Sequence, residues 1–288
     1  MAITTEKFTK ILICLCACVF VFVSETAAQE TKIKWFGHAA FSITTPKGKI
    51  LLVDPWLKNP SNPEAKDGKN PLDAITKADY ILLTHGYFDH VGETVEIAKK
   101  TGAKLVTNYE LGTNLVKLQN FPEKQATFET IGDIGGEIQT PDGEVIIAFT
   151  NAVHSSSVQN PNAGVNQAEL VEGGNPVGFV IQIKDGPTIY DTGDTAYFQD
   201  MKTIGEAYRI DLALIFIGGH SGMEPRMAAR AAQAVNPKLA IPQHYSDLPF
   251  FTKDASNFAA ELKKYNIPFY EMKPGETITF RGAQMEKK

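Results

Sequence analysis

The sequence has little cysteine: its three cysteines, Cys14, Cys16 and Cys18, all lie within the first 28 residues. The rest of the chain can therefore form no disulfide and can offer no thiolate as a metal ligand or nucleophile. Positive charge is also scarce, since 28 lysines and arginines stand against 33 aspartates and glutamates, which gives a formal net charge of −5. Because the chain has no basic cluster, we expect it to bind no nucleic acid.

Long apolar runs are absent as well. The longest, from Ile11 to Val23, falls short of the about 20 residues that a membrane-spanning helix needs. Lys7 and Lys10 precede it and a pair of alanines follows it, which is typical of a secretory signal peptide. We therefore predict a signal peptide over residues 1–28, export to the periplasm or the extracellular medium, and no stable membrane span after its removal; an N-terminal membrane anchor is the alternative.

Residues 29–288 are predicted to form a single domain, because no linker-like stretch divides them. Short β-rich runs alternate with turns, and they predict strands over residues 33–36, 41–45, 49–53, 80–83, 104–107, 178–183, 188–190, 212–217 and 239–241. Helical patterns are found over residues 91–101, 225–235 and 256–265. This arrangement places the protein in the α/β (α+β) class.

Two stretches of the chain share one pattern. Each contains a strand, a turn with glycine and an apolar strand, over residues 41–53 in the first stretch and 178–190 in the second. An aspartate follows directly in both, Asp54 and Asp191. The shared pattern indicates a weak internal duplication, with two pseudo-equivalent halves in one domain.

The segment between Asn151 and Val177 has a different character. It is polar and glycine-rich, and it shows no clear periodicity. A loop of this length in a compact domain is usually functional or without fixed structure. We expect either a lid beside an active site or a surface loop that has no role.

The residues that can carry chemistry gather at predicted strand ends. The chain has six histidines, each at or near such an end: His38, His85, His90, His154, His220 and His244. Asp89 and Asp194 stand in comparable positions. Because imidazoles and carboxylates are natural metal ligands, their collection at one edge of a sheet predicts a metal site.

The order of these residues resembles a known signature. His85-x-x-x-Asp89-His90 is similar to the His-x-His-x-Asp-His motif of the metallo-β-lactamase superfamily, and His154, Asp194 and His244 follow in that family's order. Residues 35–38 and 52–60 also resemble one branch, the metal-dependent hydrolases similar to ascorbate-6-phosphate lactonases. The resemblance runs from about residue 33 to residue 280. It implies a four-layer αββα sandwich with the metals at one edge.

The resemblance also implies a ligand set for divalent metal ions, most commonly zinc, with manganese or iron as alternatives. One ion would be bound by His85 and His154, and the other by Asp89, His90 and His244. Asp194 would bridge the two ions. A metal lowers the pKa of bound water to about 7, so that a hydroxide forms at neutral pH.

The sequence departs from the family at one ligand, because position 87 is tyrosine where the family has histidine. A catalytic zinc usually has three protein ligands, and the first ion would keep three, His85, His154 and the shared Asp194. Three interpretations stay open: two metals with an altered first site, one metal in the second site, or a non-catalytic metal- or ligand-binding descendant. Tyr87 would be a phenolate ligand or an aromatic that fills the space of a lost ligand.

The function that the resemblance implies is hydrolysis of a small-molecule substrate by a metal-bound hydroxide. A lactone is the preferred substrate and a phosphodiester the second. Asp89 or Asp194 would orient the nucleophile and pass its proton to the leaving group, while His220 and Tyr245 would polarise the scissile group. The sequence is also compatible with a homo-oligomer.

Several residues keep two interpretations each. His38 either lines the cavity or hydrogen-bonds a turn, and His220 is as well suited to anchoring backbone as to catalysis. Asp54 either bonds to ligand histidines from behind or caps a turn before Pro55. An aromatic group either shapes a substrate pocket or packs in the core: Trp56, Phe250 and Phe251.

Overall fold

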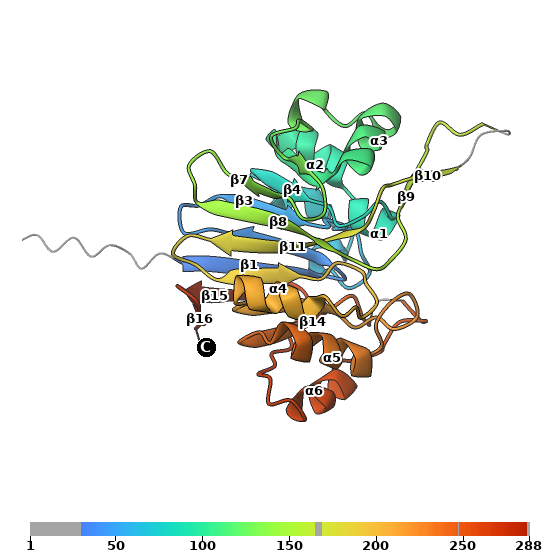
Figure 1. Cartoon of the computed structure of the whole chain (residues 1–288). Helices are drawn as coiled ribbons and strands as arrows, with labels where there is room; N and C mark the ends of the chain where they lie inside the picture. Colours follow the sequence, from blue (N-terminus) through green and yellow to red (C-terminus); the bar gives the residue numbers. More distant parts are fainter. Residues whose placement is uncertain (1–29, 165–168, 247, 287–288) are drawn as a thin grey trace, which may run out of the picture.

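Two β-sheets form the centre of the molecule (Figure 1). The computed structural model describes residues 30–164, 169–246 and 248–286. The first sheet has the strand order β16-β15-β1-β2-β3-β4-β5-β6. Its strands are β1 (Glu30–Gly37), β2 (Ala40–Thr44), β3 (Ile50–Val53), β4 (Tyr80–Leu82), β5 (Lys104–Asn108), β6 (Ile131–Gly132), β15 (Thr277–Arg281) and β16 (Gln284–Met285).

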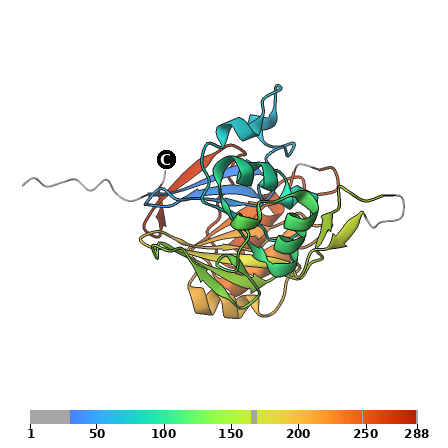
Figure 2. The same ribbon diagram turned by 90° about the horizontal axis from the view of Figure 1, so that it is seen from above.

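The second sheet has the order β14-β13-β12-β11-β8-β7. Its strands are β7 (Glu137–Gln139), β8 (Val145–Asn151), β11 (Val177–Ile183), β12 (Thr188–Asp191), β13 (Leu212–Phe216) and β14 (Leu239–Gln243). A separate pair, β9 (Ser157–Gln159) and β10 (Leu170–Glu172), forms an antiparallel hairpin. This hairpin extends away from the body of the molecule, as Figures 1 and 2 both show.

Helices cover the outer face of each sheet, which gives four layers (Figure 1). One layer contains α1 (Phe88–Val91), α2 (Thr94–Thr101) and α3 (Tyr109–Gln119), and the other contains α4 (Met201–Tyr208), α5 (Pro225–Val235) and α6 (Ser256–Lys263). Short 3-10 turns lie at Pro63–Ala65, Pro71–Ala74 and Glu123–Gln125. The predicted αββα sandwich is therefore confirmed.

The sequence of the central strands explains the layering. Consecutive residues of a strand point to opposite faces, and in β3 Leu51 packs in the core between the sheets while Leu52 packs in the second core under the helices. The first core also receives Phe179 and Ile181 from the second sheet. Strands buried on both faces appear as continuous apolar runs, which is why the sequence marked them clearly.

The elements agree with the sequence-based predictions in most places and differ in two. The helix at 225–235 has the predicted bounds. The helical stretch after position 90 is divided into α1 and α2 at Gly92, whose φ of +41° ends the first helix. The segment 151–177, predicted as a loop without periodicity, contains the paired strands β9 and β10. A short hairpin lacks a long enough alternating pattern to be recognised in a polar segment.

The two pseudo-equivalent halves have the same local topology. In the first sheet β2 pairs antiparallel with β3, and β3 pairs parallel with β4. In the second sheet β11 pairs antiparallel with β12, and β12 pairs parallel with β13. Asp54 and Asp191 therefore lie at the same point of the two halves, at the carboxyl end of the strand where the parallel pairing begins.

The remaining predictions about chain organisation fall outside these findings. The predicted signal peptide lies outside the described residues, and the single domain over 29–288 stays a prediction. Among the described helices, none combines the length and the apolar character that crossing a bilayer requires.

Candidate metal centre

The predicted site residues come from strand ends that meet at one edge of the sandwich. His85 and His244 follow β4 and β14, and Asp194 follows β12. His38 lies in the turn between β1 and β2, and His154 follows β8. Because the strands before these residues all run toward the same edge, side chains far apart in sequence reach one place, as is common at the ends of parallel strands.

The structure brings the candidate ligands into two groups. One consists of His85, His154 and Asp194. The other consists of four residues, His38, Asp89, His90 and His244. Within each group the possible ligand atoms lie within 4.8 Å of one another, which is close enough to hold a metal ion. His38 is added to the second group and Asp194 is grouped with the first, while the other residues fall into the two groups that the resemblance implied.

Asp194 lies between the two groups. One carboxylate oxygen, Oδ2, is 3.7 Å from Nε2 of His154 and 3.2 Å from Nε2 of His244. The other, Oδ1, is 3.4 Å from Nε2 of His90. The side chain is almost fully buried. Asp194 therefore contacts histidines of both groups, which is the arrangement expected of a bridging carboxylate.

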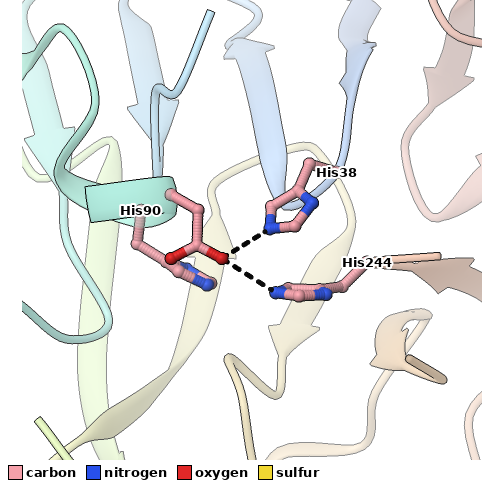
Figure 3. Close-up of side chains that lie close together, drawn as sticks. His38, His90 and His244 are labelled. Atoms are coloured by element: carbon pink, nitrogen blue, oxygen red, sulfur yellow. Dashed lines mark hydrogen bonds and ion pairs between the residues drawn. The ribbon is translucent and has the colours of Figure 1, made fainter. Parts of the chain in front are cut away.

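Asp89 is held by histidines of its own group. Figure 3 shows His38 and His244 directed toward one carboxylate oxygen, with His90 beside them. Nε2 of His38 is 3.1 Å from Oδ2 of Asp89, and Nε2 of His244 is 3.8 Å from the same oxygen. An ionised carboxylate can only accept, so His38 donates its Nε2 proton and orients Asp89. His38 is fully buried and its ring reaches Asp89, and it is not among the residues that line the cavity.

Asp54 supports the histidines from behind. Its Oδ2 is 2.7 Å from Nδ1 of His90 and accepts the hydroxyl proton of Thr84 at 2.6 Å. Since that hydroxyl has given its only proton to Asp54, it accepts from Nδ1 of His85, 3.1 Å away. Both imidazoles thus use Nδ1 for these contacts, which leaves Nε2 as the nitrogen that can face a metal. The interpretation of Asp54 as a turn cap alone was therefore incomplete.

The backbone around the site is strained at three of these positions. His38, Asp54 and His244 have φ values of +54°, +41° and +60°. Non-glycine residues rarely adopt this left-handed region, and such strain concentrates at functional sites. The strain is balanced locally, because the backbone N–H of His244 donates to the carbonyl of His38 at 2.9 Å and the indole N–H of Trp35 donates to the same carbonyl at 3.0 Å.

The two central carboxylates favour their ionised form. Burial alone would raise the pKa of Asp89, but the hydrogen bond from His38 and the charges of nearby histidines hold that pKa below its usual range. Asp194 behaves alike, since burial is outweighed by His244 and His90 and the pKa lies well below its usual value. Two buried negative charges in one cavity require a compensating cation.

The histidines divide into neutral ligands and one that responds to the carboxylates. Burial lowers the pKa values of His85, His154 and His244, which keeps these imidazoles neutral. Burial would also lower the pKa of His90, but Asp194 and Asp54 outweigh it and raise that pKa well above its ordinary value. A neutral imidazole is the form that binds metal, and the pull of the carboxylates on His90 shows that the cavity attracts positive charge.

The donor atoms fit a divalent metal ion. Four buried Nε2 atoms have no hydrogen-bond partner among the described residues, those of His85, His90, His154 and His244. Buried polar atoms are almost always satisfied, so four unpartnered nitrogens beside two ionised carboxylates mark the place of a ligand. Nitrogen with carboxylate oxygen is the donor set of zinc, and manganese or iron also accept it.

Tyr87 occupies the edge of the first group. Its ring centroid is 4.9 Å from that of His85 and 5.5 Å from that of His154. Its hydroxyl forms a hydrogen bond of 2.5 Å with the hydroxyl of Ser155. The side chain is half-buried. The ring therefore fills space beside the two histidines, while its oxygen is engaged by the segment that follows β8.

Two residues expected to polarise the substrate are placed differently. Tyr245 points away from both groups: it stacks on Trp35, with ring centroids 5.7 Å apart, and its hydroxyl donates to Glu271 at 3.1 Å. Burial, with Glu271 nearby, raises the pKa of the Tyr245 phenol above its usual value, so that it does not transfer protons near neutral pH. His220 is exposed, and its ring lies 5.4 Å from that of Phe250. The structure does not bring Tyr245 to the ligands as the sequence predicted, because its ring and its hydroxyl are engaged by Trp35 and Glu271.

A cavity of about 410 Å³ leads to the metal groups. Its deep part contains Asp89, His154 and Asp194, and its wall includes Ser157 and Gln159 of the β9 strand. The β9–β10 hairpin therefore borders the site, as the lid interpretation expected. The other lining residues are Tyr87, Phe88, Leu170, Ser221, Leu248, Phe250 and Phe251. Of the aromatic group that the sequence left open, Phe250 and Phe251 line the cavity, while Trp56 packs edge-on against His38 with ring centroids 4.9 Å apart.

Sequence reasoning missed Phe88, Leu170 and Leu248. Phe88 adjoins Asp89 within the recognised motif, so its position was a usable signal. The sequence contains no such signal for Leu170, because its contact with the cavity depends on the pairing of β9 with β10.

A family model described as a beta-lactamase superfamily domain matches residues 49–245. A UPF0173 metal-dependent hydrolase of Thermodesulfovibrio yellowstonii is 47% identical over 250 residues, which cover 86% of this chain and 91% of the relative. A UPF0173 metal-dependent hydrolase of Anaeromyxobacter sp. strain K is 43% identical over 258 residues, which cover 89% of each chain. The family model spans every residue of the two ligand groups except His38.

Solved structures show the same fold. Igni18, a metallo hydrolase from the archaeon Ignicoccus hospitalis, is 30% identical with a TM-score of 0.72, and the match covers 87% of this chain and 98% of that one. An isothiocyanate hydrolase from Delia radicum gut bacteria is 19% identical with a TM-score of 0.63, covering 87% of this chain and 99% of that one. The second likeness extends to the fold alone.

Proposed function

This chain belongs to the UPF0173 metal-dependent hydrolases of the metallo-β-lactamase superfamily, and from that premise we propose that it hydrolyses a small ester-like substrate, a lactone or another carboxylic ester. The observation that carries the proposal is the convergence of four buried imidazole Nε2 atoms with two ionised carboxylates, beside a cavity that is lined by His154, Asp89 and Asp194. A phosphodiester is the second substrate class.

The reaction requires a nucleophilic oxygen and a place for its proton. A bound divalent metal, in our proposal zinc, lowers the pKa of water and supplies hydroxide at neutral pH. In the reaction a bond forms between the water oxygen and the carbonyl carbon, and the bond from that carbon to the ester oxygen breaks. Asp89 and Asp194 both line the cavity, so either carboxylate can orient the water and pass its proton to the departing oxygen.

A specific observation supports a second candidate function. Tyr87 stands where the superfamily has a histidine ligand, and its hydroxyl is engaged by Ser155. Loss of one ligand weakens the first group, and a protein that retained only the second group could bind metal without turnover. This candidate predicts metal content without hydrolysis of any ester.

The place of action remains a proposal as well. The charged start and short apolar core of residues 1–28 support export to the periplasm or the extracellular medium. Mass spectrometry of protein recovered from outside the cytoplasm should find a mature chain that begins near Gln29. Recovery of the uncleaved chain from the membrane fraction would favour the anchor instead.

Metal analysis together with a hydrolysis screen tests the proposed activity. The purified protein should retain zinc, manganese or iron after dialysis, and it should hydrolyse members of a panel of lactones, carboxylic esters and phosphodiesters. Asp194→Asn should lose both properties, whereas Glu129→Gln, which changes an exposed carboxylate outside both groups, should keep them. Retained metal with no turnover across the panel would replace the hydrolase with the binding protein.

A further inference from the structure

We propose that the substrate carries an uncharged apolar arm, which lies against Phe88, Leu170 and Phe250 at the mouth of the cavity. This inference rests on the proposed function, because it describes the part of the ester that does not react.

Exposed apolar side chains are concentrated at the mouth. Seven large apolar side chains of the described residues are exposed, and three of them line this one cavity. Phe88 is 54% exposed, Leu170 57% and Phe250 56%. They come from α1, from β10 and from the segment after β14, so that no single element explains them. A contiguous apolar surface at a cavity mouth marks a binding site.

The charges of the cavity also favour an uncharged arm. Among its described lining residues there is no lysine or arginine, and the only carboxylates are Asp89 and Asp194 in the deep part. The polar residues around them are uncharged: Tyr87, Ser157, Gln159 and Ser221. An anionic arm would meet no cation to pair with it and would lose hydration without compensation. A neutral arm has no such cost.

The apolar rings are positioned by contacts behind them. Phe88 packs against Trp56 with ring centroids 5.6 Å apart, and Phe250 packs against Phe251 at 4.7 Å. Phe251 in turn meets His244 at 4.7 Å. The aromatic wall therefore continues from the metal group to the mouth. An ester whose carbonyl lies at Asp89 and Asp194 extends its arm along this wall.

A series of γ-butyrolactones with n-alkyl substituents from methyl to octyl tests the arm. Each added methylene that becomes buried should raise kcat/KM about fourfold until the cavity is filled. A lactone of matched length that ends in a carboxylate should lose this gain. Equal kcat/KM across the series, or preference for the charged lactone, would overturn the inference.

Surface variants locate the contact. Phe250→Ser and Leu170→Ser should each reduce the gain per methylene by half or more. Phe128→Ser is the matched control, because Phe128 is 84% exposed and lines a different cavity. Its chain-length dependence should equal that of the unchanged protein. If Phe128→Ser has the same effect as Phe250→Ser, the arm does not lie at this mouth.

Binding separates this inference from the proposed activity. The 2-alkyl tetrahydrofurans have a similar ring without the carbonyl, and calorimetry measures their affinity with no reaction. Affinity that rises with chain length and falls in Phe250→Ser supports the apolar site even if no lactone is hydrolysed, in which case only the hydrolase proposal fails. Hydrolysis of lactones with no length dependence in rate or binding overturns the apolar arm and leaves the hydrolase intact.

Discussion

The two ligand groups differ in where they lie relative to solvent. The three imidazoles of the second group, which we call the enclosed group, are at most 1% exposed, and only its carboxylate, that of Asp89, borders the cavity, with a side chain that is 12% exposed. His154 of the first group borders the cavity, and its side chain is 10% exposed. The second group offers four possible ligands, and the first group offers three, with Tyr87 beside them. A ligand set with an imidazole at the cavity wall can exchange a histidine for an aromatic residue more readily than a set whose imidazoles are all enclosed.

The largest effect is expected from breaking the enclosed group. His244→Ala should remove tightly bound metal and lower kcat/KM by more than about 100-fold, the upper range for changes behind a ligand. His154→Ala should reduce metal content by about half or less, because the enclosed group stays complete. Metal content by mass spectrometry, with circular dichroism to check folding, measures both. Equal loss of metal in the two variants would remove the distinction between the groups.

A smaller loss is expected when the support of the enclosed group is altered. Asp54→Asn keeps the shape of the side chain but weakens the hydrogen bond to Nδ1 of His90, 2.7 Å away. Metal affinity should fall about 10- to 100-fold, measured by competition with a chromophoric chelator. Asp73→Asn is the control, because it changes an exposed aspartate that belongs to neither ligand group. Unchanged affinity in Asp54→Asn would show that the contact does not tune the metal.

Returning a histidine to the first ligand group tests the same comparison between the two groups by adding a ligand instead of removing one. Tyr87→His should raise the metal content toward two ions per chain and increase kcat/KM several-fold, since it returns the missing imidazole. Tyr87→Phe serves as the control, because it keeps the ring contacts and removes only the hydrogen bond to Ser155. A fall in activity in Tyr87→His, without a gain of metal, would mean that the tyrosine takes part in this enzyme's own chemistry.

The smallest effect is expected at Asp191, the counterpart of Asp54 in the second half, and it concerns stability. Asp191 accepts from Gly193 and Gln243, and burial, with Asp54 nearby, raises its pKa to about 7. Between about pH 4 and pH 7 the folded chain keeps a proton that the unfolded chain has lost, so the free energy of unfolding falls as pH rises. Asp191→Asn keeps the acceptor oxygen and removes this titration.

Denaturant unfolding of the metal-free protein measures this difference. The free energy of unfolding of Asp191→Asn, relative to the unchanged protein, should rise by roughly 1–4 kcal/mol between pH 4 and pH 7. A difference that is constant across this range would place the titration elsewhere.

The sequence predicted what depends on order and local pattern. The signature around Asp89 identified the superfamily, and the buried strands and α5 stood out as apolar runs and helical periodicity. Contacts between residues far apart in the sequence could not be predicted from it. The role of His38 depends on its approach to Asp89, 51 positions away, and Tyr245 was assigned to the site because it adjoins His244. A ring packed on Trp35 cannot be deduced from that adjacency.

The backbone hydrogen bond from His244 to His38 joins the first sheet to the second at the edge where the metal ligands meet. If the sheets separate at this edge, ligands of the second group also move apart. An ion bound there therefore holds the two sheets together. Binding to the folded chain alone shifts the equilibrium away from the open state. The resistance of the protein to heat and proteases should therefore follow the supply of metal, independently of whether substrate is present.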